Sequence, residues 1–331
     1  MKAAVNKDYG PAEKVVHIAE VARPEINDEE VLVKVYATSV STGAWRMVEM
    51  NAGGVLQIPA RMIFGLFRPR NPIQGGSFSG RVVAVGASVT RFKMGDEVFG
   101  VVGAGAHAEY IAIAEDKTIV KKPETLGYGE AAALPFGGLS ALVFLRDFAK
   151  VQSGQKVLVT GASGGVGVFG VQIAKHLGAE VTALTSTDNV ELVRSLGADH
   201  IIDYKRVDFT RGKETYDVIF DTAGVSSFRE AARVLSPGGL FVPLEFGVPD
   251  ILRSMRTDPQ GRRIVIGVNG DSAADLAVLA DLVESGVVRS VIDSIEPLTG
   301  IADAYRRVSE RHKVGAVVVN VAMPLPVRAA A

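Results

Sequence analysis

The chain has 331 residues, of which 47% are hydrophobic and 22% charged, a composition typical of a globular protein with room for two domains. Its formal net charge of −1 provides no overall basic field, so we expect neither nucleic acid nor a membrane as a partner. The absence of cysteine excludes disulfides, thiolate metal sites and a cysteine nucleophile. The lack of cysteine also fits a reducing compartment, so the cytoplasm is the default expectation, and residues 1–8 are charged and lack an apolar signal core.

Short strands separated by turns are predicted for residues 1–120. Three runs of alternating or β-branched residues carry this prediction, at 30–36, 80–86 and 96–101. Such a pattern favours a compact all-β unit, in the form of a partly closed barrel.

An irregular stretch at residues 50–72 interrupts this unit. It carries apolar side chains among arginines, namely Met62, Ile63, Phe64, Leu66 and Phe67 among Arg61, Arg68 and Arg70. One interpretation is a loop that tucks its aromatic residues into the core. The other is a mobile lid or pocket wall, because long loops without structure of their own tend to be functional.

After residue 122 the pattern changes to alternating helices and strands. We expect an apolar helix at 129–150 with a break at 135–138, and a helix at 227–235. Strands are expected at 218–221, 239–244 and 263–268, followed by a helix at 271–285 capped by Ser272, and then by further strand and helix segments at 287–295, 299–311 and 316–321. This alternation predicts a parallel, doubly wound sheet.

The strongest motif lies in residues 156–184. A buried strand at 156–160 leads into Gly161-Ala162-Ser163-Gly164-Gly165-Val166-Gly167, a helix that ends near Gly178, and a second strand at 180–184. Glycines at this strand–helix turn let a dinucleotide pyrophosphate approach the backbone and the helix N-terminus. A tight turn needs glycine even without a ligand, but the complete strand–helix–strand context favours nucleotide binding. The predicted cofactor contacts in this turn are Gly161, Ser163, Gly164, Gly165, Val166 and Gly167.

Loops at the ends of the later strands supply further candidate contacts. Ligands of doubly wound sheets bind at the carboxyl ends of the strands. The candidates there are Thr222 and Gly224 after the strand at 218–221, and Phe246 and Gly247 after the strand at 239–244.

Several strings, taken together, point to one family. They are His107-Ala108-Glu109-Tyr110, Glu130-Ala131-Ala132-Ala133-Leu134-Pro135, the 160–167 glycine turn, Leu196-Gly197-Ala198-Asp199-His200-Ile201-Ile202-Asp203-Tyr204 and Leu235-Ser236-Pro237-Gly238-Gly239. In this order and spacing the chain resembles the zinc-free quinone oxidoreductase (zeta-crystallin-like) branch of the medium-chain dehydrogenase/reductase superfamily. The resemblance extends over nearly the whole chain.

That resemblance implies an α/β protein with two domains. A GroES-like β-barrel catalytic domain is expected at 1–122, a Rossmann NAD(P)-binding domain at 123–270, and a return to the catalytic domain at 271–331. It also implies a homodimer, with the edge strand of the Rossmann sheet near 264–268 as the contact.

The residues of this chain do not provide the family's zinc site. Zinc relatives carry Cys, Asp and Gly-His-Glu where this chain has Ser41, Ala44 and Gly75-Gly76-Ser77, so neither thiolate nor imidazole is available at these positions. Members of the zinc-free branch usually carry Asn at Ser41, Asp at Ala44 and an acid at Ser77. Their loss indicates either an altered substrate pocket or weakened catalysis.

The implied reaction is hydride transfer to a quinone or an α,β-unsaturated carbonyl. Such acceptors are already activated by conjugation, so the protein mainly positions the hydride donor and excludes water. A hydroxyl can steady the developing oxyanion, and the candidates are Ser41 and Thr42, with Tyr9 and Arg46 further back. Two alternatives stay open: a nicotinamide-binding protein with little turnover, and a zinc-free alcohol dehydrogenase, which the absence of an evident general acid disfavours.

NADPH is favoured over NADH as the cofactor. NAD-selective sheets place an acid at the end of the second strand, where this chain has the small polar residues Thr185 and Ser186. NADH stays possible, because Asp188 would repel a 2′-phosphate. Arg311 or Lys313, in a tail that resembles the family's phosphate-facing stretch, is the predicted source of a cation, with Tyr204 packing beside it.

Overall fold

A computed structural model describes residues 1–51 and 57–322 of the chain. Its contacts divide the chain into two compact units. Unit 1 comprises Met1–Phe136, Asp271–Glu284 and Ser290–Ala331, and unit 2 comprises Gly137–Gly270 and Ser285–Arg289. Unit 1 extends past the predicted boundary at residue 122 because Ala132 and Ala133, in the first half of helix α4 (Tyr128–Val143), pack against Ala37 and Val318 of the barrel.

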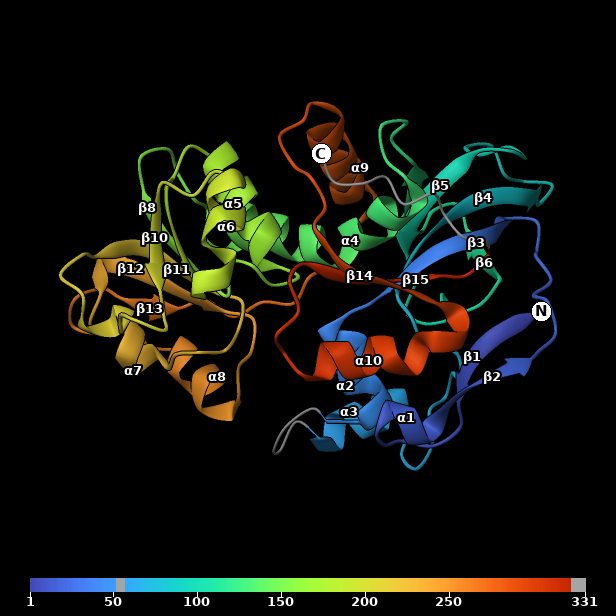
Figure 1. The fold of residues 1–331 in the computed structure, drawn as a ribbon, viewed down its shortest axis with the longest axis horizontal. Helices are drawn as coiled ribbons and strands as arrows, with labels where there is room; N and C mark the ends of the chain where they lie inside the picture. Colours follow the sequence, from blue (N-terminus) through green and yellow to red (C-terminus); the bar gives the residue numbers. More distant parts are fainter. Residues whose placement is uncertain (52–56, 323–331) are drawn as a thin grey trace. The chain divides into compact units, whose positions relative to one another are not determined.

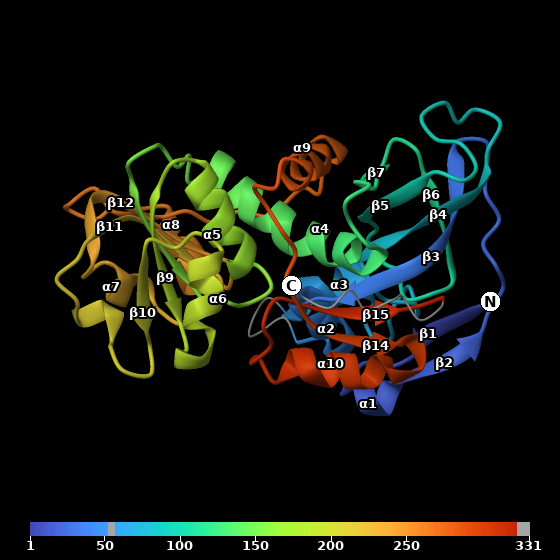
Figure 2. The ribbon, with the colours of Figure 1, turned by 45° about the horizontal axis from the view of Figure 1, so that its top comes forward.

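Unit 1 is built around the long strand β3 (Glu30–Val40), which pairs with three neighbours, β4, β6 and β15. Its sheet has the order β14-β15-β3-β4-β5-β7, with β6 paired to β3, and β1 and β2 form a separate pair (Figure 2). The register between β3 and β4 shifts at two points, and such bulges bend a sheet towards closure. Every second side chain, Val31, Val33 and Val35, is buried in the barrel core, as the alternation in the sequence predicts.

The other elements of unit 1 are the remaining strands of this sheet, the β1–β2 pair and the helices. They are β1 (Lys2–Asn6), α1 (Ala12–Val15), β2 (Val16–Glu20), α2 (Thr42–Glu49), α3 (Gln57–Phe64), β4 (Ser77–Val85), β5 (Glu97–Val101), β6 (Tyr110–Ala114), β7 (Ile119–Lys121), α9 (Ala273–Glu284), β14 (Ile292–Pro297), α10 (Ile301–Ser309) and β15 (Ala316–Asn320). The backbone N–H of Asp275 bonds to Ser272 Oγ, which confirms the predicted cap of α9.

Unit 2 is a six-stranded, fully parallel sheet in the order β10-β9-β8-β11-β12-β13 (Figure 1). Its elements are β8 (Lys156–Thr160), α5 (Gly167–His176), β9 (Glu180–Thr185), α6 (Val190–Ser195), β10 (His200–Asp203), β11 (Tyr216–Asp221), α7 (Phe228–Ala231), β12 (Leu235–Pro243), α8 (Val248–Ser254) and β13 (Arg263–Ile264). The sheet confirms the predicted doubly wound α/β fold. Successive side chains point to opposite faces, so Leu158 packs towards α7 while its neighbour Val159 lies against Gly170 of α5.

Three predicted elements after residue 122 differ from the structure. The expected break at 135–138 is absent, because α4 continues through Pro135 to Val143 and ends in a π-helical turn at Phe144–Phe148. Most of its side chains between Ala131 and Leu145 are buried, and this packing outweighs the hydrogen bond that proline removes.

The segment Tyr128–Phe148 is long and apolar enough to cross a membrane, but 78% of its apolar window is buried, which is typical of a core helix.

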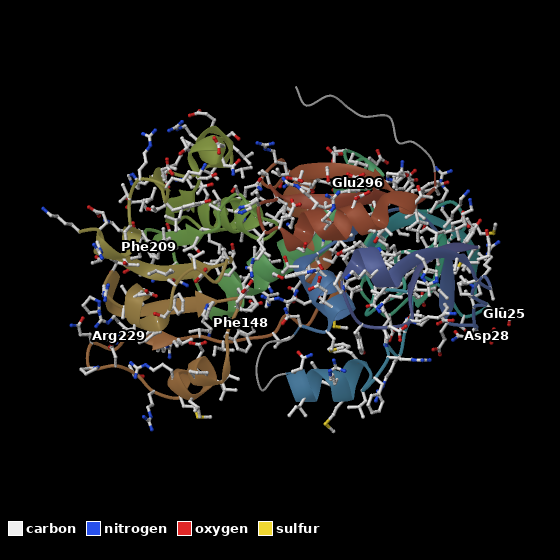
Figure 3. All side chains as sticks on the ribbon, turned by 60° about the horizontal axis from the view of Figure 1, so that its bottom comes forward. Glu25, Asp28, Phe148, Phe209, Arg229 and Glu296 are labelled. Atoms are coloured by element: carbon white, nitrogen blue, oxygen red, sulfur yellow. The ribbon has the colours of Figure 1, made fainter. Side chains whose placement is uncertain are left out.

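The other two differences are shortened elements. Helix 227–235 is reduced to α7 because Leu235 already pairs with Tyr216 as part of β12. Strand 263–268 is reduced to the two residues of β13. At Gly267 the backbone lies so close to the ring of Phe148 (labelled in Figure 3) that a Cβ would be 2.1 Å from it.

Residues 50–72 also depart from the prediction of an irregular stretch, since they contain helix α3; residues 52–56 lie outside the described residues. The apolar side chains at 62–64 and 66–67 are exposed, so the interpretation that they tuck into the core is wrong.

A chain of buried polar side chains links β3, the loop before β6 and helix α10. The Thr38 hydroxyl donates to the Ser77 carbonyl oxygen (2.7 Å), so it accepts from Nδ1 of His107 (3.1 Å), whose Nε2 then accepts from the Tyr305 hydroxyl (3.1 Å). His107 is 1% exposed, and this burial lowers its pKa to about 3. The ring is therefore neutral at physiological pH, with both nitrogens occupied.

His107 gives the protein a measurable pH dependence. In the unfolded chain it titrates near its usual pKa of 6.5, so between that pH and about 3 the unfolded state binds a proton that the folded state does not. The free energy of unfolding should fall as pH falls, with His107 contributing a loss of about 2.7 kcal/mol by about pH 4.5. Denaturant titration across this range, compared with His107→Gln, measures the contribution. The exposed His17→Gln is the control and should keep the wild-type slope, whereas an unchanged slope in His107→Gln would contradict the assignment.

Candidate functional site

The glycine turn after β8 has no space for side chains at two of its predicted positions. Gly161 adopts a positive φ of 59°, and a Cβ there would be 2.7 Å from Cβ of Ala223. A Cβ at Gly167 would be 2.1 Å from the Gly161 carbonyl oxygen, closer than any real contact. The glycines thus bring the first turn of α5 directly onto the end of β8, where the helix N-terminus favours an anion.

The remaining turn residues complete the backbone of this cradle. The Gly164 N–H donates to the Gly161 carbonyl (2.8 Å), and Val166 caps α5 with no hydrogen bond from its side chain. A Cβ on Gly137 of α4 would be 2.1 Å from the Gly165 carbonyl oxygen, so the backbone of α4 packs directly against the glycine turn. These close approaches fit the requirement of a pyrophosphate for bare backbone.

The buried carboxylate of Asp221 holds the centre of this edge together. Its Oδ1 accepts from the Thr160 hydroxyl (2.6 Å) and from the N–H of Gly224 (2.9 Å), and its Oδ2 accepts from the N–H and the hydroxyl of Ser226 (both 3.2 Å). The Thr222 hydroxyl donates back to the Thr160 carbonyl (2.7 Å). Asp221 thus ties the end of β8 to the end of β11.

These two strands form the topological switch point of the sheet. From β8 the chain proceeds outwards through β9 and β10, and from β11 it proceeds in the other direction through β12 and β13. Doubly wound sheets bind their ligands outside the carboxyl ends of the strands at this point. The predicted contacts Thr222 and Gly224 follow β11 directly, and Phe246 and Gly247 follow β12.

The end of β9 carries hydroxyls in place of an acid. The Thr185 hydroxyl and Asn189 Nδ2 each donate to Ser163 Oγ (3.1 Å), and Asn189 also donates to Ser186 Oγ (3.1 Å). Because β10 runs parallel to β9, Tyr204 lies next to this point, and its N–H bonds to the Thr185 carbonyl (3.0 Å). The Tyr204 side chain is exposed.

An exposed ion pair lies beside these hydroxyls. Lys205 Nζ is 2.9 Å from Asp188 Oδ2, and this pairing raises the pKa of Lys205. Asp188 is therefore neutralised by a neighbour that the sequence analysis did not identify.

A cavity of about 360 Å³ opens in unit 2 beside the loops that follow β11 and β12. Two of its acids are committed to capping, because Glu230 accepts from the Ser227 N–H (2.9 Å) and Asp250 from the Gly247 N–H (2.9 Å). We assign these carboxylates to local structure.

The candidate hydroxyls of unit 1 lie at the start of α2. Ser41 is the N-cap, whose Oγ accepts from the Ala44 N–H (3.0 Å), and Thr42 is the first helical residue. Capping uses an acceptor lone pair of Ser41 and leaves its O–H group as a donor. Arg46 lies one turn further along the helix, on the side of Thr42.

Tyr9 and Phe136 lie close to α2 in the same unit. The Tyr9 hydroxyl donates to the Gly65 carbonyl (2.9 Å), and burial raises the pKa of Tyr9 above its usual value despite the nearby Arg61. The N–H of Gly10 bonds to the Val48 carbonyl of α2 (3.1 Å), which holds the Tyr9 loop in place. A Cβ on Gly43 would be 3.3 Å from the ring of Phe136, so this aromatic residue packs against the start of α2.

The two tail cations have different environments. Arg311 is exposed and ends α10 with a positive φ of 59°. Lys313 Nζ donates to the Gly315 carbonyl (2.6 Å), and burial lowers its pKa to about 8. Their predicted contact with a 2′-phosphate stays a prediction.

Among residues 1–51 and 57–322, no group of three or more His, Cys, Asp and Glu side chains has an arrangement that could hold a metal ion. At the positions that correspond to zinc ligands, Ser41 caps a helix and the carbonyl of the buried Ser77 accepts from Thr38.

Sequence reasoning missed three residues of these sites. Asp221 ends a buried strand, and an acid in that position is a signal for a structural carboxylate. Lys205 becomes relevant only once β10 is paired with β9, and Phe136 only once α4 is known to continue past Pro135.

Comparisons with known proteins agree with this geometry. Residues 27–124 match the alcohol dehydrogenase GroES-like domain, and residues 196–319 match the zinc-binding dehydrogenase family. The chain is 33% identical to an NADPH-dependent alkenal/one oxidoreductase of Arabidopsis thaliana, over 98% of this chain and 80% of that protein. It is also 33% identical to the chloroplast envelope quinone oxidoreductase homolog of the same species, over 97% and 98% of the two chains. The structure of the quinone oxidoreductase from Coxiella burnetii superposes with a TM-score of 0.85 at 27% identity, over 97% of this chain and 99% of that one.

A GroES-like unit followed by a Rossmann-type unit defines a medium-chain dehydrogenase/reductase, and the chain belongs to that superfamily. Within it, the chain belongs to the quinone oxidoreductase-like branch, which confirms the predicted family. It is an oxidoreductase whose homologues are NAD(P)H-dependent quinone and alkenal reductases.

The glycine cradle gives a direct test of the nucleotide site. Gly167→Ala places a methyl group against the Gly161 carbonyl, and we expect it to destabilise the protein by about 2 kcal/mol and to abolish cofactor binding. Thermal melting and nucleotide fluorescence titration measure the two effects. Gly103→Ala is the matched control, because a Cβ there meets nothing within 4 Å, and it should leave both unchanged.

Proposed function

We propose that the protein is an NADPH-dependent reductase of conjugated carbonyl acceptors, either quinones or α,β-unsaturated ketones and aldehydes. The observation that carries the proposal is the combination of a nucleotide cradle at Gly161–Gly167 with a barrel unit whose metal-ligand positions are occupied by Ser41, Ala44 and Ser77. The alkenal/one and quinone reductases among its relatives support the choice of acceptor.

The residues of unit 2 fit a nicotinamide dinucleotide. The bare backbone at Gly161, Gly164 and Gly167 provides the close approach that a pyrophosphate needs, at the N-terminus of α5. The loops after β11 and β12, with Thr222, Gly224, Phe246 and Gly247, would hold the nicotinamide half. When bound, the reduced nicotinamide supplies a hydride to the acceptor.

The nature of the acceptor follows from what the barrel unit lacks. A simple alcohol or ketone needs its oxygen polarised strongly, which zinc relatives achieve with a metal ligand set. The described residues contain no such set, which favours an acceptor whose own conjugation spreads the incoming charge onto an oxygen.

Ser41 is the group best suited to that oxygen. Its O–H group stays a donor while its lone pair caps α2, and the helix N-terminus adds a favourable dipole at the same point. In this role Ser41 would hold the enolate or quinol oxygen while the proton arrives from water. Thr42 would supply a second hydroxyl. Tyr9 and Arg46 would line the pocket farther from the reacting oxygen.

The preference for NADPH rests on the end of β9. No acid from β9 itself is placed to accept the ribose 2′-hydroxyl, and Thr185 and Ser186 present small hydroxyls in its place. Lys205 compensates Asp188 in this structure, and in the proposed complex this exposed lysine would exchange that ion pair for the 2′-phosphate. Lys205 thus joins Arg311 and Lys313 as a candidate cation.

A homodimer and a cytoplasmic location accompany this proposal as expectations. The edge of the Rossmann sheet after Ile264 leaves Val268 exposed, which supports an interface there. Sedimentation velocity tests the dimer.

Turnover is the first test of the function. We expect consumption of NADPH, followed by its absorbance, on addition of a simple quinone or an enone, and weaker consumption of NADH. Ser41→Ala should lower kcat by about tenfold or more, because it removes a donor to the developing oxyanion. Binding of NADPH without oxidation by any acceptor would favour a nucleotide-binding protein, and no binding of either nucleotide would refute the proposed site.

Cofactor choice gives a second test. Lys205→Gln should weaken NADPH binding about fivefold and leave NADH binding unchanged, because one exposed contact to phosphate is lost. Asp188→Asn should strengthen NADPH binding by a similar factor. Titration of both nucleotides measures these effects, with Lys213→Gln as a control that removes an exposed cation of the same unit. Equal losses for NADPH and NADH in Lys205→Gln would contradict the assignment.

A further inference from the structure

Residues 57–70, here called the α3 segment, expose an unusual amount of apolar surface. The segment consists of α3 and the six residues that follow it, and Figure 3 shows its helix at the margin of unit 1. Its exposed apolar side chains are Ile58 (66%), Met62 (66%), Ile63 (60%), Phe64 (38%), Leu66 (54%) and Phe67 (80%). Exposed apolar side chains gathered in one short segment favour a contact surface.

The segment is also cationic. It carries Arg61, Arg68 and Arg70, and the sequence has no Asp or Glu from residue 50 to residue 95. Asp8, which is itself exposed, lies 3.6 Å from Arg68. The net charge of −1 for the whole chain conceals this local excess of positive charge.

The backbone of the segment is folded back on itself, so its apolar side chains project from a fixed frame. Arg61 Nη1 donates to the Leu66 carbonyl (2.8 Å) and Arg70 Nη2 to the Met62 carbonyl (2.9 Å). The Arg70 N–H bonds to the Phe64 carbonyl (2.9 Å), and the Tyr9 hydroxyl donates to the carbonyl of Gly65 (2.9 Å). Carbonyl groups that are already bonded can enter a medium of low polarity without an unpaired acceptor.

We propose that the α3 segment binds the surface of an anionic lipid bilayer. Ile58, Met62, Ile63, Leu66 and Phe67 enter the boundary between headgroups and acyl chains, and the arginines meet the lipid phosphates. Apolar side chains beside cations are the pattern of interfacial membrane segments. The proposal replaces the expectation of no membrane partner, which rested on net charge alone.

A second copy of the chain fits this surface less well. In a two-fold symmetric contact the same patch meets itself, so the cations Arg61, Arg68 and Arg70 of the two copies would be brought into one contact. Like charges that meet in a desolvated contact are unfavourable, whereas the phosphates of an anionic bilayer complement them.

The advantage that membrane binding would give to the protein rests on the proposed function. Quinones and long-chain enones are apolar and partition into bilayers, so a reductase held at the surface meets a higher local concentration of acceptor. Binding to lipid, however, is measured without turnover, so a failure of one proposal can be told from a failure of the other.

The test is flotation of the full-length protein with vesicles of phosphatidylcholine, with or without about one third phosphatidylglycerol. We expect binding to the anionic vesicles only, and its loss in about 0.5 M NaCl, where surface charges are screened. The double variant Ile63→Ser, Phe67→Ser should bind about tenfold or more weakly. Arg68→Gln, which removes a cation that does not hold the segment's backbone, should bind several-fold more weakly.

The control is Met255→Ser in unit 2, which removes an apolar side chain of matching exposure (77%) and should bind as the wild type does. Thermal melting checks that all variants are folded. Absence of binding to anionic vesicles would overturn the proposal. A dimer that dissociates in the double variant would also overturn it, because the surface would then belong to a second copy. So would a double variant that has a raised KM for a water-soluble acceptor but binds vesicles as the wild type does.

Discussion

The proposed nucleotide site depends on the hydrogen bonds that the carboxylate of Asp221 accepts. A buried carboxylate is costly unless its oxygens are satisfied by donors, and here they accept from Thr160, from Ser226 and from the backbone of the loop after β11. The same bonds fix that loop against the end of β8. Because this is the switch point of the sheet, this one carboxylate fixes the loop after β11 relative to the glycine turn after β8.

Much of the fold and part of the site could be predicted from the sequence, for physical reasons. The βαβ motif is local: strand, glycine turn and helix are determined by neighbours within a few residues, and the structure contains each of them. The helix break at 135–138 was wrong because the packing of a buried helix outweighs the intrinsic preference of Pro135. Helix α3 was missed because it has only eight residues, too few for a helical period to be recognised in the sequence.

The long-range parts of the site were beyond the reach of sequence patterns. Lys205 neutralises Asp188 across two parallel strands, and a chain read in order places them 17 residues apart without contact. The double use of Ser41, which caps a helix with its lone pair and keeps its proton, shows why the structural and the functional interpretation of one hydroxyl do not compete. In the barrel, the neutral His107 is likewise an imidazole whose two nitrogens are already engaged, and a histidine in that state is no metal ligand.

The pairing of β8 with β11 has a consequence for how the protein acquires its site. Thr160 and Asp221 are 61 residues apart in the chain, so their contact forms only after a long loop has closed, at an entropic cost that local structure cannot offset. The glycine turn is local, but its contacts with the loop after β11 exist only when β8 and β11 are paired. A nucleotide that binds the proposed site would therefore stabilise only forms of the chain in which this long-range pairing is present.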